Sequence, residues 1–389
     1  MQILPRNRIE EEHLKALKRF GYQPTDWTFE RQLSALRKKF PDWKTDGMQS
    51  LSRWSPSRFE FVELVPLYYL ATTHIQTMQQ MSKWALPATQ FLIASDPSQK
   101  LAAYCNEHSN HVSRDDVGNV CRHIIWVNIG LINFVKVLAN HFAWVLAGDK
   151  EGLIAAFDDV ARTQDLEVLA VRFRDRRFPV DTEMLRGAYP QQCSEDISWF
   201  PPPFGRIEDL SPKTQTVVRI LQIAMTTFVI GHEMGHIYLG HTGFHPRKLL
   251  ITSQTLPFPA PFRAEIEADL VGTMSVFDGI AAEVSKSRFS IDFTWIAPLL
   301  YLSTMTGVAL HYSDEKAQEW AWRLIMFSKT LVGTLQKCEF EHERIRRISL
   351  SLPTIAAATI EWMRLELAPS APNDFSYIFL DQLRTVCGR

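Results

Sequence analysis

The stretch GHEMGHIYLGH, residues 231–241, decides how the rest of this sequence is interpreted. It places three histidines and one glutamate directly after the apolar run LQIAMTTFVI. The pattern from Ser211 and Pro212 to Gly240 predicts one long helix, because Ser-Pro is a helix start and glycine a helix end. His232 and His236 are four residues apart, so on that helix both side chains lie on the same face.

Two imidazoles at this spacing can bind one Zn²⁺, and Glu233 between them can take a proton from a water molecule. In a chain with 12 histidines, the pattern HExxH arises by chance in roughly a few per cent of sequences. The apolar helix argues against coincidence, because unpaired histidines and a glutamate are costly to bury. The motif therefore predicts a metal site.

The third metal ligand has two candidates. His241 is typical of a pattern in which the chain turns at a glycine and returns a histidine to the metal, but Gly240 comes one residue late and His241 one early for it. The other candidate is the stretch EIEAD, residues 265–269, in which Glu265 and Asp269 share a helix face. Glu265 can bind the metal while Asp269 accepts a hydrogen bond from a ligand histidine. We favour Glu265 and expect His241 to be a helix-end residue near the cleft.

HEMGH followed by EIEAD resembles the gluzincin zinc metallopeptidases, particularly the HtpX and CAAX-prenyl-protease branch. IIWVNIGLI (124–132) resembles a segment of that branch whose edge strand pairs with substrate backbone. HERIRRI (342–348) resembles a later segment, although Cys338 and Glu339 stand where the branch has His-Pro. Soluble bacterial gluzincins, such as the ImmA/IrrE-like regulators and the Lit phage-exclusion protease, look like closer functional analogues.

The resemblance implies an α+β, mainly helical fold: a zincin-like core with a small sheet and an HExxH active-site helix. It implies one Zn²⁺ per chain on His232, His236 and Glu265, with Glu233 as general base. An extended substrate is expected to pair with residues 123–128, where Ile125 and Val127 are the candidate partners. Four residues are candidates for stabilising the oxyanion: His311, Tyr312, His342 and Arg344.

The 389 residues, 46% of them hydrophobic and 22% charged, are typical of a globular protein with a sizeable core. We expect a helical N-terminal region at 1–100 for substrate or partner recognition, a zincin-like metallopeptidase domain at 101–350 and a C-terminal helical extension at 351–389. VCRHIIWVN (120–128) is the best strand candidate. The proline-rich segment 187–212 is expected to be a lid or a connector.

Charge and cysteine usage narrow the class of protein. A net charge of −1 gives no reason to expect binding to nucleic acid. The five cysteines are scattered without a CxxC pair, and the N-terminus lacks the apolar core of a signal peptide, so a cytoplasmic location is expected. Residues 291–310 are nearly long enough to span a bilayer, and we favour a buried helix over membrane association there.

The sequence thus predicts a zinc-dependent endopeptidase that hydrolyses a specific intracellular protein, in stress response, regulation or phage defence, with a regulatory partner protein as a further expectation. One alternative is a catalytically weak zinc-containing sensor or binding module. Glu233 argues against it, because a structural zinc site has no use for a general base. The other alternative is a membrane-embedded metalloprotease.

Overall fold

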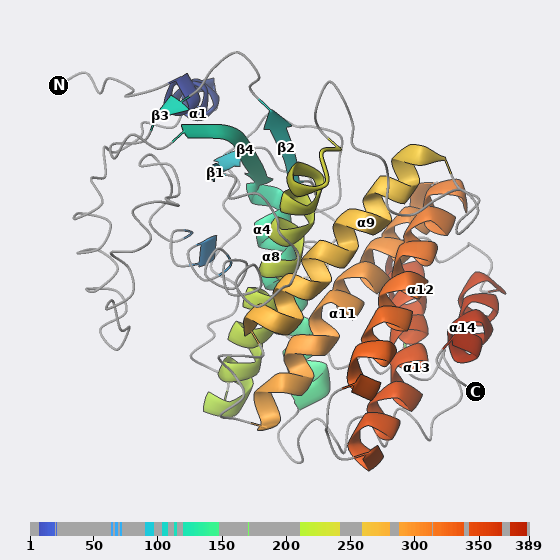
Figure 1. The fold of residues 1–389 in the computed structure, drawn as a ribbon. Helices are drawn as coiled ribbons and strands as arrows, with labels where there is room; N and C mark the ends of the chain where they lie inside the picture. Colours follow the sequence, from blue (N-terminus) through green and yellow to red (C-terminus); the bar gives the residue numbers. More distant parts are fainter. Residues whose placement is uncertain are drawn as a thin grey trace.

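The computed structural model describes residues 8–19, 90–96, 103–107, 113–114, 120–147, 211–241, 259–280, 288–312, 314–337, 342–367 and 374–386, with a few isolated positions between them. These segments form a mainly helical α+β fold with a small mixed sheet, as predicted (Figure 1). Residues 187–210 of the proline-rich segment and most of the predicted N-terminal region lie outside the described residues.

The predicted strand at 120–128 is the middle strand of the sheet. It is β4 (Val120–Asn128), and its side chains from Ile124 to Val127 are buried. Its partners are β1 (Gln90–Asp96), which runs parallel to it, and β2 (Ala103–Glu107) and β3 (Ser113–Arg114), which run antiparallel. β1 lies within the region that we predicted to be helical.

Helices make up the rest of the described chain. They are α1 (Arg8–Arg19), α4 (Ile129–Ala147), α8 (Pro212–Tyr238), α9 (Ala260–Met274), the π-helix η3 (Ser275–Ile280), α11 (Arg288–Tyr312), α12 (Asp314–Lys337), α13 (His342–Leu367) and α14 (Asp374–Val386). α13 runs through the domain boundary that we predicted at residue 350. Figure 1 shows α8, α9, α11 and α12 side by side below the sheet.

α8 carries the HEMGH motif and lies at the centre of the fold. Its start follows the sequence prediction, because the Ser211 side chain accepts a hydrogen bond from the backbone N–H of Thr214 and Pro212 is the first helical residue. The helix packs against α4, α9 and α11 and against the sheet strands β2 and β4. Packing on all these sides explains why its apolar residues are not confined to one stripe.

α11 contains the long apolar segment of the sequence. Two stretches, Phe293–Leu310 in α11 and Thr214–Tyr238 in α8, are long and apolar enough to cross a membrane, and 94% of the first is buried among its neighbours. Two of its buried polar residues bond within the helix: Ser303 donates to the Leu299 carbonyl at 2.6 Å and Thr304 to the Leu300 carbonyl at 2.7 Å. Such internal bonding lets polar side chains lie in an apolar core.

Candidate metal centre

Glycine and alanine let α8 and α9 approach each other closely at the site. A Cβ atom added to Gly235 would lie 2.8 Å from the Cα of Ala268, and one added to Gly272 would lie 2.6 Å from the Phe228 carbonyl oxygen. Both separations are shorter than real Cβ contacts, so larger residues would force the two helices apart. This close contact allows acidic side chains of α9 to reach the histidines of α8.

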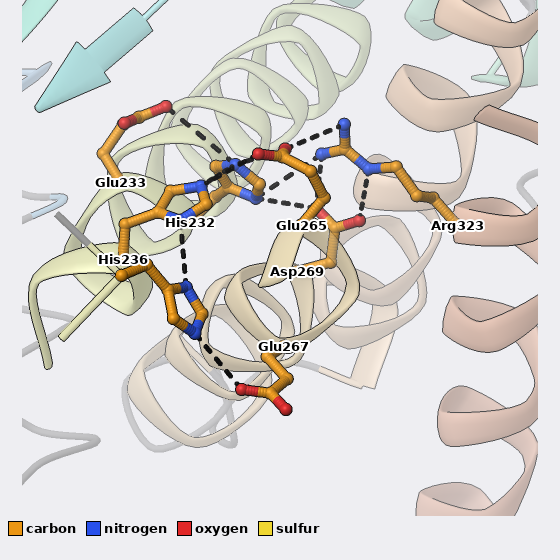
Figure 2. A network of polar contacts seen from close by, with 8 residues as sticks. His232, Glu233, His236, Glu265, Glu267, Asp269 and Arg323 are labelled. Atoms are coloured by element: carbon orange, nitrogen blue, oxygen red, sulfur yellow. Dashed lines mark hydrogen bonds and ion pairs between the residues drawn. The ribbon is translucent and has the colours of Figure 1, made fainter. Parts of the chain in front are cut away.

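His232, His236 and Glu265 form a group that could hold a metal ion (Figure 2). The Nε2 atoms of the two histidines are 3.1 Å apart. The Glu265 carboxylate oxygens lie 3.3 Å from His232 Nε2 and 3.4 Å from His236 Nε2. A tetrahedral ion with ligands at 2.0–2.1 Å needs ligand atoms about 3.3 Å apart. The three residues therefore fit a zinc-sized ion.

His232 is oriented by a buried ion pair. Its Nδ1 donates to Asp269 Oδ1 at 2.8 Å, which leaves Nε2 for the metal. Arg323 of α12 holds the same carboxylate with Nε at 2.6 Å from Oδ2 and Nη2 at 2.7 Å from Oδ1. Arg323 Nη1 also lies 3.4 Å from the Glu265 carboxylate, as Figure 2 shows. Asp269 thus contacts His232, a candidate ligand, and Arg323 is an addition that the sequence did not indicate.

The electrostatics of this cluster favour charged groups. Burial would lower the pKa of His232, but the hydrogen bond and charge of Asp269 raise it to about 10 in the absence of metal. Burial would raise the pKa of Asp269, but the Arg323 guanidinium holds it below its usual range. The pKa of Glu265 is likewise well below its usual range, because the hydrogen bonds from His232 and His236 outweigh its burial. Both carboxylates are therefore ionised at neutral pH.

His236 has a different partner. Its Nδ1 lies 3.1 Å from Nδ1 of His241, whose Nε2 lies 3.2 Å from the buried carboxylate of Glu267. Burial lowers the pKa of His241, and the neighbouring His236 lowers it further. We expected His241 to be a helix-end residue near the cleft; it does follow the end of α8, and it contacts the ligand histidine from the side away from the metal position.

A cavity of about 370 Å³ opens beside these ligands. Glu233 lies in its wall, buried, with Oε1 at 4.0 Å from His232 Nε2. The thiol of Cys105 on β2, which also lines the cavity, contacts Glu233, and burial together with that carboxylate raises the pKa of the thiol. Much of the remaining wall is apolar: Leu131, Phe228, Val229, Met305 and Trp320. Glu233 thus faces a space in which a substrate and a water molecule can meet the ligand set.

The expected substrate strand is placed differently. Ile125 and Val127 are buried in β4, which is paired on one side with β1 and on the other with β2. The prediction that residues 123–128 offer a free edge to substrate is therefore wrong, since both sides of the strand are already used. Among the described residues β2 pairs only with β4, and its Ala103, Tyr104 and Cys105 line the cavity. Within the described sheet, the strand edge beside the candidate ligands is therefore that of β2.

The four oxyanion candidates do not belong to the described cavity wall. His311 and Tyr312 end α11 and His342 and Arg344 begin α13, and the structure describes their backbone but not their side chains. The described wall instead contains Tyr301 of α11 and Arg323. Tyr301 is buried, and its pKa is raised by burial and influenced by the charges of Arg323, Asp269 and Glu233. Helical spacing could have linked Tyr301 to the buried face of its helix, but not to the site.

No protein-family model, curated protein or solved structure matches this chain.

Proposed function

We propose that this protein is a zinc-dependent endopeptidase of the gluzincin type, with a zincin-like core built from α8, α9 and the sheet. One observation carries the proposal: His232, His236 and Glu265 converge at ligand distances beside Glu233, in a cavity bordered by a strand edge. The glutamate distinguishes a hydrolytic site from a structural one, because a structural zinc site is closed by its ligands and needs no base.

The charges of the site support a divalent cation. Glu233, Glu265 and Asp269 bring three carboxylates to the site, and Arg323 brings one guanidinium. The carboxylates outnumber the guanidinium, so a divalent cation suits the charge of the site. His232 and His236 each use Nδ1 for a protein contact and present Nε2 to the same point. Two imidazoles and one carboxylate are a ligand set that zinc peptidases use.

When bound, Zn²⁺ would polarise the scissile carbonyl and lower the pKa of the attacking water. Glu233 takes the proton from that water and passes it to the leaving amine. The Tyr301 hydroxyl, from the wall of the same cavity, donates a hydrogen bond to the developing oxyanion. Arg323 keeps Asp269 ionised, so that His232 retains the tautomer needed for metal binding.

Substrate binds in this proposal as an extended segment along β2. An exposed edge offers backbone N–H and C=O groups to a peptide, which gives affinity without demanding a particular sequence. β2 lines the cavity next to Glu233, so a peptide added to its edge passes the ligand set. The apolar wall formed by Leu131, Val229 and Met305 then receives a substrate side chain.

The test compares wild type with Glu233→Gln in expressing cells and as purified protein. Both proteins should bind one Zn²⁺, while new protein termini should appear only with wild type. Loss of a general base lowers turnover roughly 10²–10⁴-fold. Glu319→Gln, an exposed change on α12, is the matched control and should behave as wild type. If wild type and Glu233→Gln both bind zinc and yield the same termini, the protein is a zinc-containing sensor or binding module instead.

A further inference from the structure

The turn that ends α8 differs from an ordinary helix end in the residues that it brings together. The backbone N–H of His241 donates to the His236 carbonyl at 2.8 Å, and the N–H of Gly240 donates to the Ile237 carbonyl at 3.2 Å. Gly240 has φ +71°, so the pair of bonds and the left-handed glycine form a Schellman motif. In this motif the two residues joined by the bond that spans five residues of sequence usually make an apolar contact. Here those two residues are His236 and His241.

The side chains of these residues continue the connection. His236 Nδ1 lies 3.1 Å from His241 Nδ1, and His241 Nε2 lies 3.2 Å from Glu267. A histidine that binds metal through Nε2 carries its proton on Nδ1 and donates it. His241 accepts that bond when its own proton is on Nε2, from which it donates to the carboxylate. Each of the two hydrogen bonds then has one donor and one acceptor, with His241 neutral.

The hydrogen-bond series begins at His236 on α8 and ends at Glu267 on α9, the two helices that carry the candidate metal ligands. Glu267 is two residues after Glu265 on α9, and Figure 2 shows it set apart from the Glu265–Arg323 contact. The side chains of His241 and Glu267 are nearly inaccessible, at 6% and 2% exposure. Water therefore has little access to compete for these hydrogen bonds, and the orientation of the His236 ring depends on them.

We propose that Gly240, His241 and Glu267 are positioning residues for His236: the turn at Gly240 places His241 so that it transmits the Glu267 carboxylate to the ligand ring. The two ligand histidines are then oriented by different partners. Asp269 and Arg323 orient His232. His241 and Glu267 orient His236. This inference rests on the metal site of the proposed function, but it does not require peptide hydrolysis.

The experiment measures zinc affinity by competition with a chromophoric chelator, and ligand geometry from the visible spectrum of the Co²⁺-substituted protein. His241→Ala should lower zinc affinity roughly 10–100-fold and change the Co²⁺ bands, since a partner of a ligand histidine is lost. Glu267→Gln should have a smaller effect, because its amide oxygen still accepts the hydrogen bond. The double variant should lose no more than His241→Ala alone, because both residues act through one chain of bonds.

Substitution of Gly240 is a second test that leaves the hydrogen-bonded side chains of His236, His241 and Glu267 in place. Asparagine tolerates the left-handed conformation better than alanine does, so zinc affinity should decrease in the order wild type, Gly240→Asn, Gly240→Ala. The control is His141→Phe, which replaces another buried histidine while keeping the stack on Trp362, 4.1 Å between ring centroids. Circular dichroism checks that each variant is folded.

The possible failures are distinguishable. If wild type binds no zinc, the metal site of the proposed function is wrong. If wild type binds zinc but folded His241→Ala and Gly240→Ala keep its affinity and its Co²⁺ spectrum, only the positioning role is overturned. Additive losses in the double variant would also overturn it, because His241 and Glu267 would then act separately.

Discussion

Arg323 and Asp269 are 54 residues apart in sequence and form a buried bidentate ion pair, with N···O distances of 2.6 and 2.7 Å. The pair joins α12 to α9 directly behind His232, which donates to the same carboxylate at 2.8 Å. The candidate metal site is thus built on three helices, although its candidate ligands come from two.

Arg323→Met should weaken both folding and metal binding. Removing one partner leaves the buried charge of Asp269 uncompensated, at a cost of about 3–5 kcal/mol in the free energy of unfolding, and zinc affinity should fall roughly 10–100-fold. Urea denaturation and chelator competition measure the two effects. Arg364→Met breaks the buried pair with Glu361 away from the site and should reduce stability alone. Equal zinc affinity in Arg323→Met and wild type would contradict the role of Arg323.

Gly235→Ala should separate α8 from α9. The new Cβ would lie 2.8 Å from the Ala268 Cα, a backbone atom that can move only with its helix. We expect a loss of about 1–3 kcal/mol in stability and weaker zinc binding, since Glu265 moves away with α9. Gly333→Ala is the matched control: nothing lies within 4 Å of its Cβ position, so the helix should gain up to about 1 kcal/mol. Unchanged zinc affinity in Gly235→Ala would mean that close packing does not set the ligand distances.

Proline in β2 should reveal the substrate edge. Successive residues of an edge strand direct their N–H groups to opposite sides, so either Tyr104 or Cys105 has its N–H directed away from β4. Of Tyr104→Pro and Cys105→Pro, one should abolish cleavage while the fold and zinc are retained, and the other should disturb the pairing with β4. Tyr104→Ala and Cys105→Ala control for the side chains. Full cleavage by both proline variants would contradict substrate pairing along β2.

Tyr301→Phe should lower kcat and leave KM and zinc content unchanged. The change removes one hydroxyl from a residue of the cavity wall and preserves the ring, whose centroid lies 5.9 Å from that of Phe228. Loss of a single oxyanion donor lowers kcat roughly 10²–10³-fold. Steady-state kinetics on the cleaved substrate measure it, and Tyr238→Phe, outside the described cavity wall, is the control. A kcat equal to that of wild type would leave Tyr301 as a packing residue.

Stability should fall as pH decreases from about 6.5 towards 4 because of His13. Its ring is fully buried in α1 against Trp126, and burial lowers its pKa to about 4 despite a contact with the Ser95 backbone. The unfolded chain therefore binds a proton in this window that the folded chain does not, which costs roughly 2 kcal/mol at pH 5. Urea titrations of wild type and His13→Phe test it: the stability difference should shift by that amount in favour of the variant between pH 7.5 and pH 5. A difference that is independent of pH would contradict the assignment.

Local patterns in the sequence predicted the parts of the site that depend on helix geometry. The four-residue spacing within HEMGH and within EIEAD places His232 beside His236, and Glu265 on the same face as Asp269, wherever those segments form helices. The strand at 120–128 followed in the same way from its β-branched composition. These features depend on neighbours along the chain, which a sequence displays directly.

Tertiary packing decided the rest. Three features depend on segments that meet only after folding: the charge that compensates Asp269, the pairing of both sides of β4, and the tyrosine that lines the cavity with Glu233. They come from Arg323 on α12, from β1 and β2 around β4, and from Tyr301 on α11. Hydrophobic periodicity shows that a face is covered but not which element covers it, because apolar burial is non-directional. The sequence by itself therefore determined the types of the candidate ligands and their spacing, whereas the partners that orient them and the strand edge beside them were set by how the helices and strands pack.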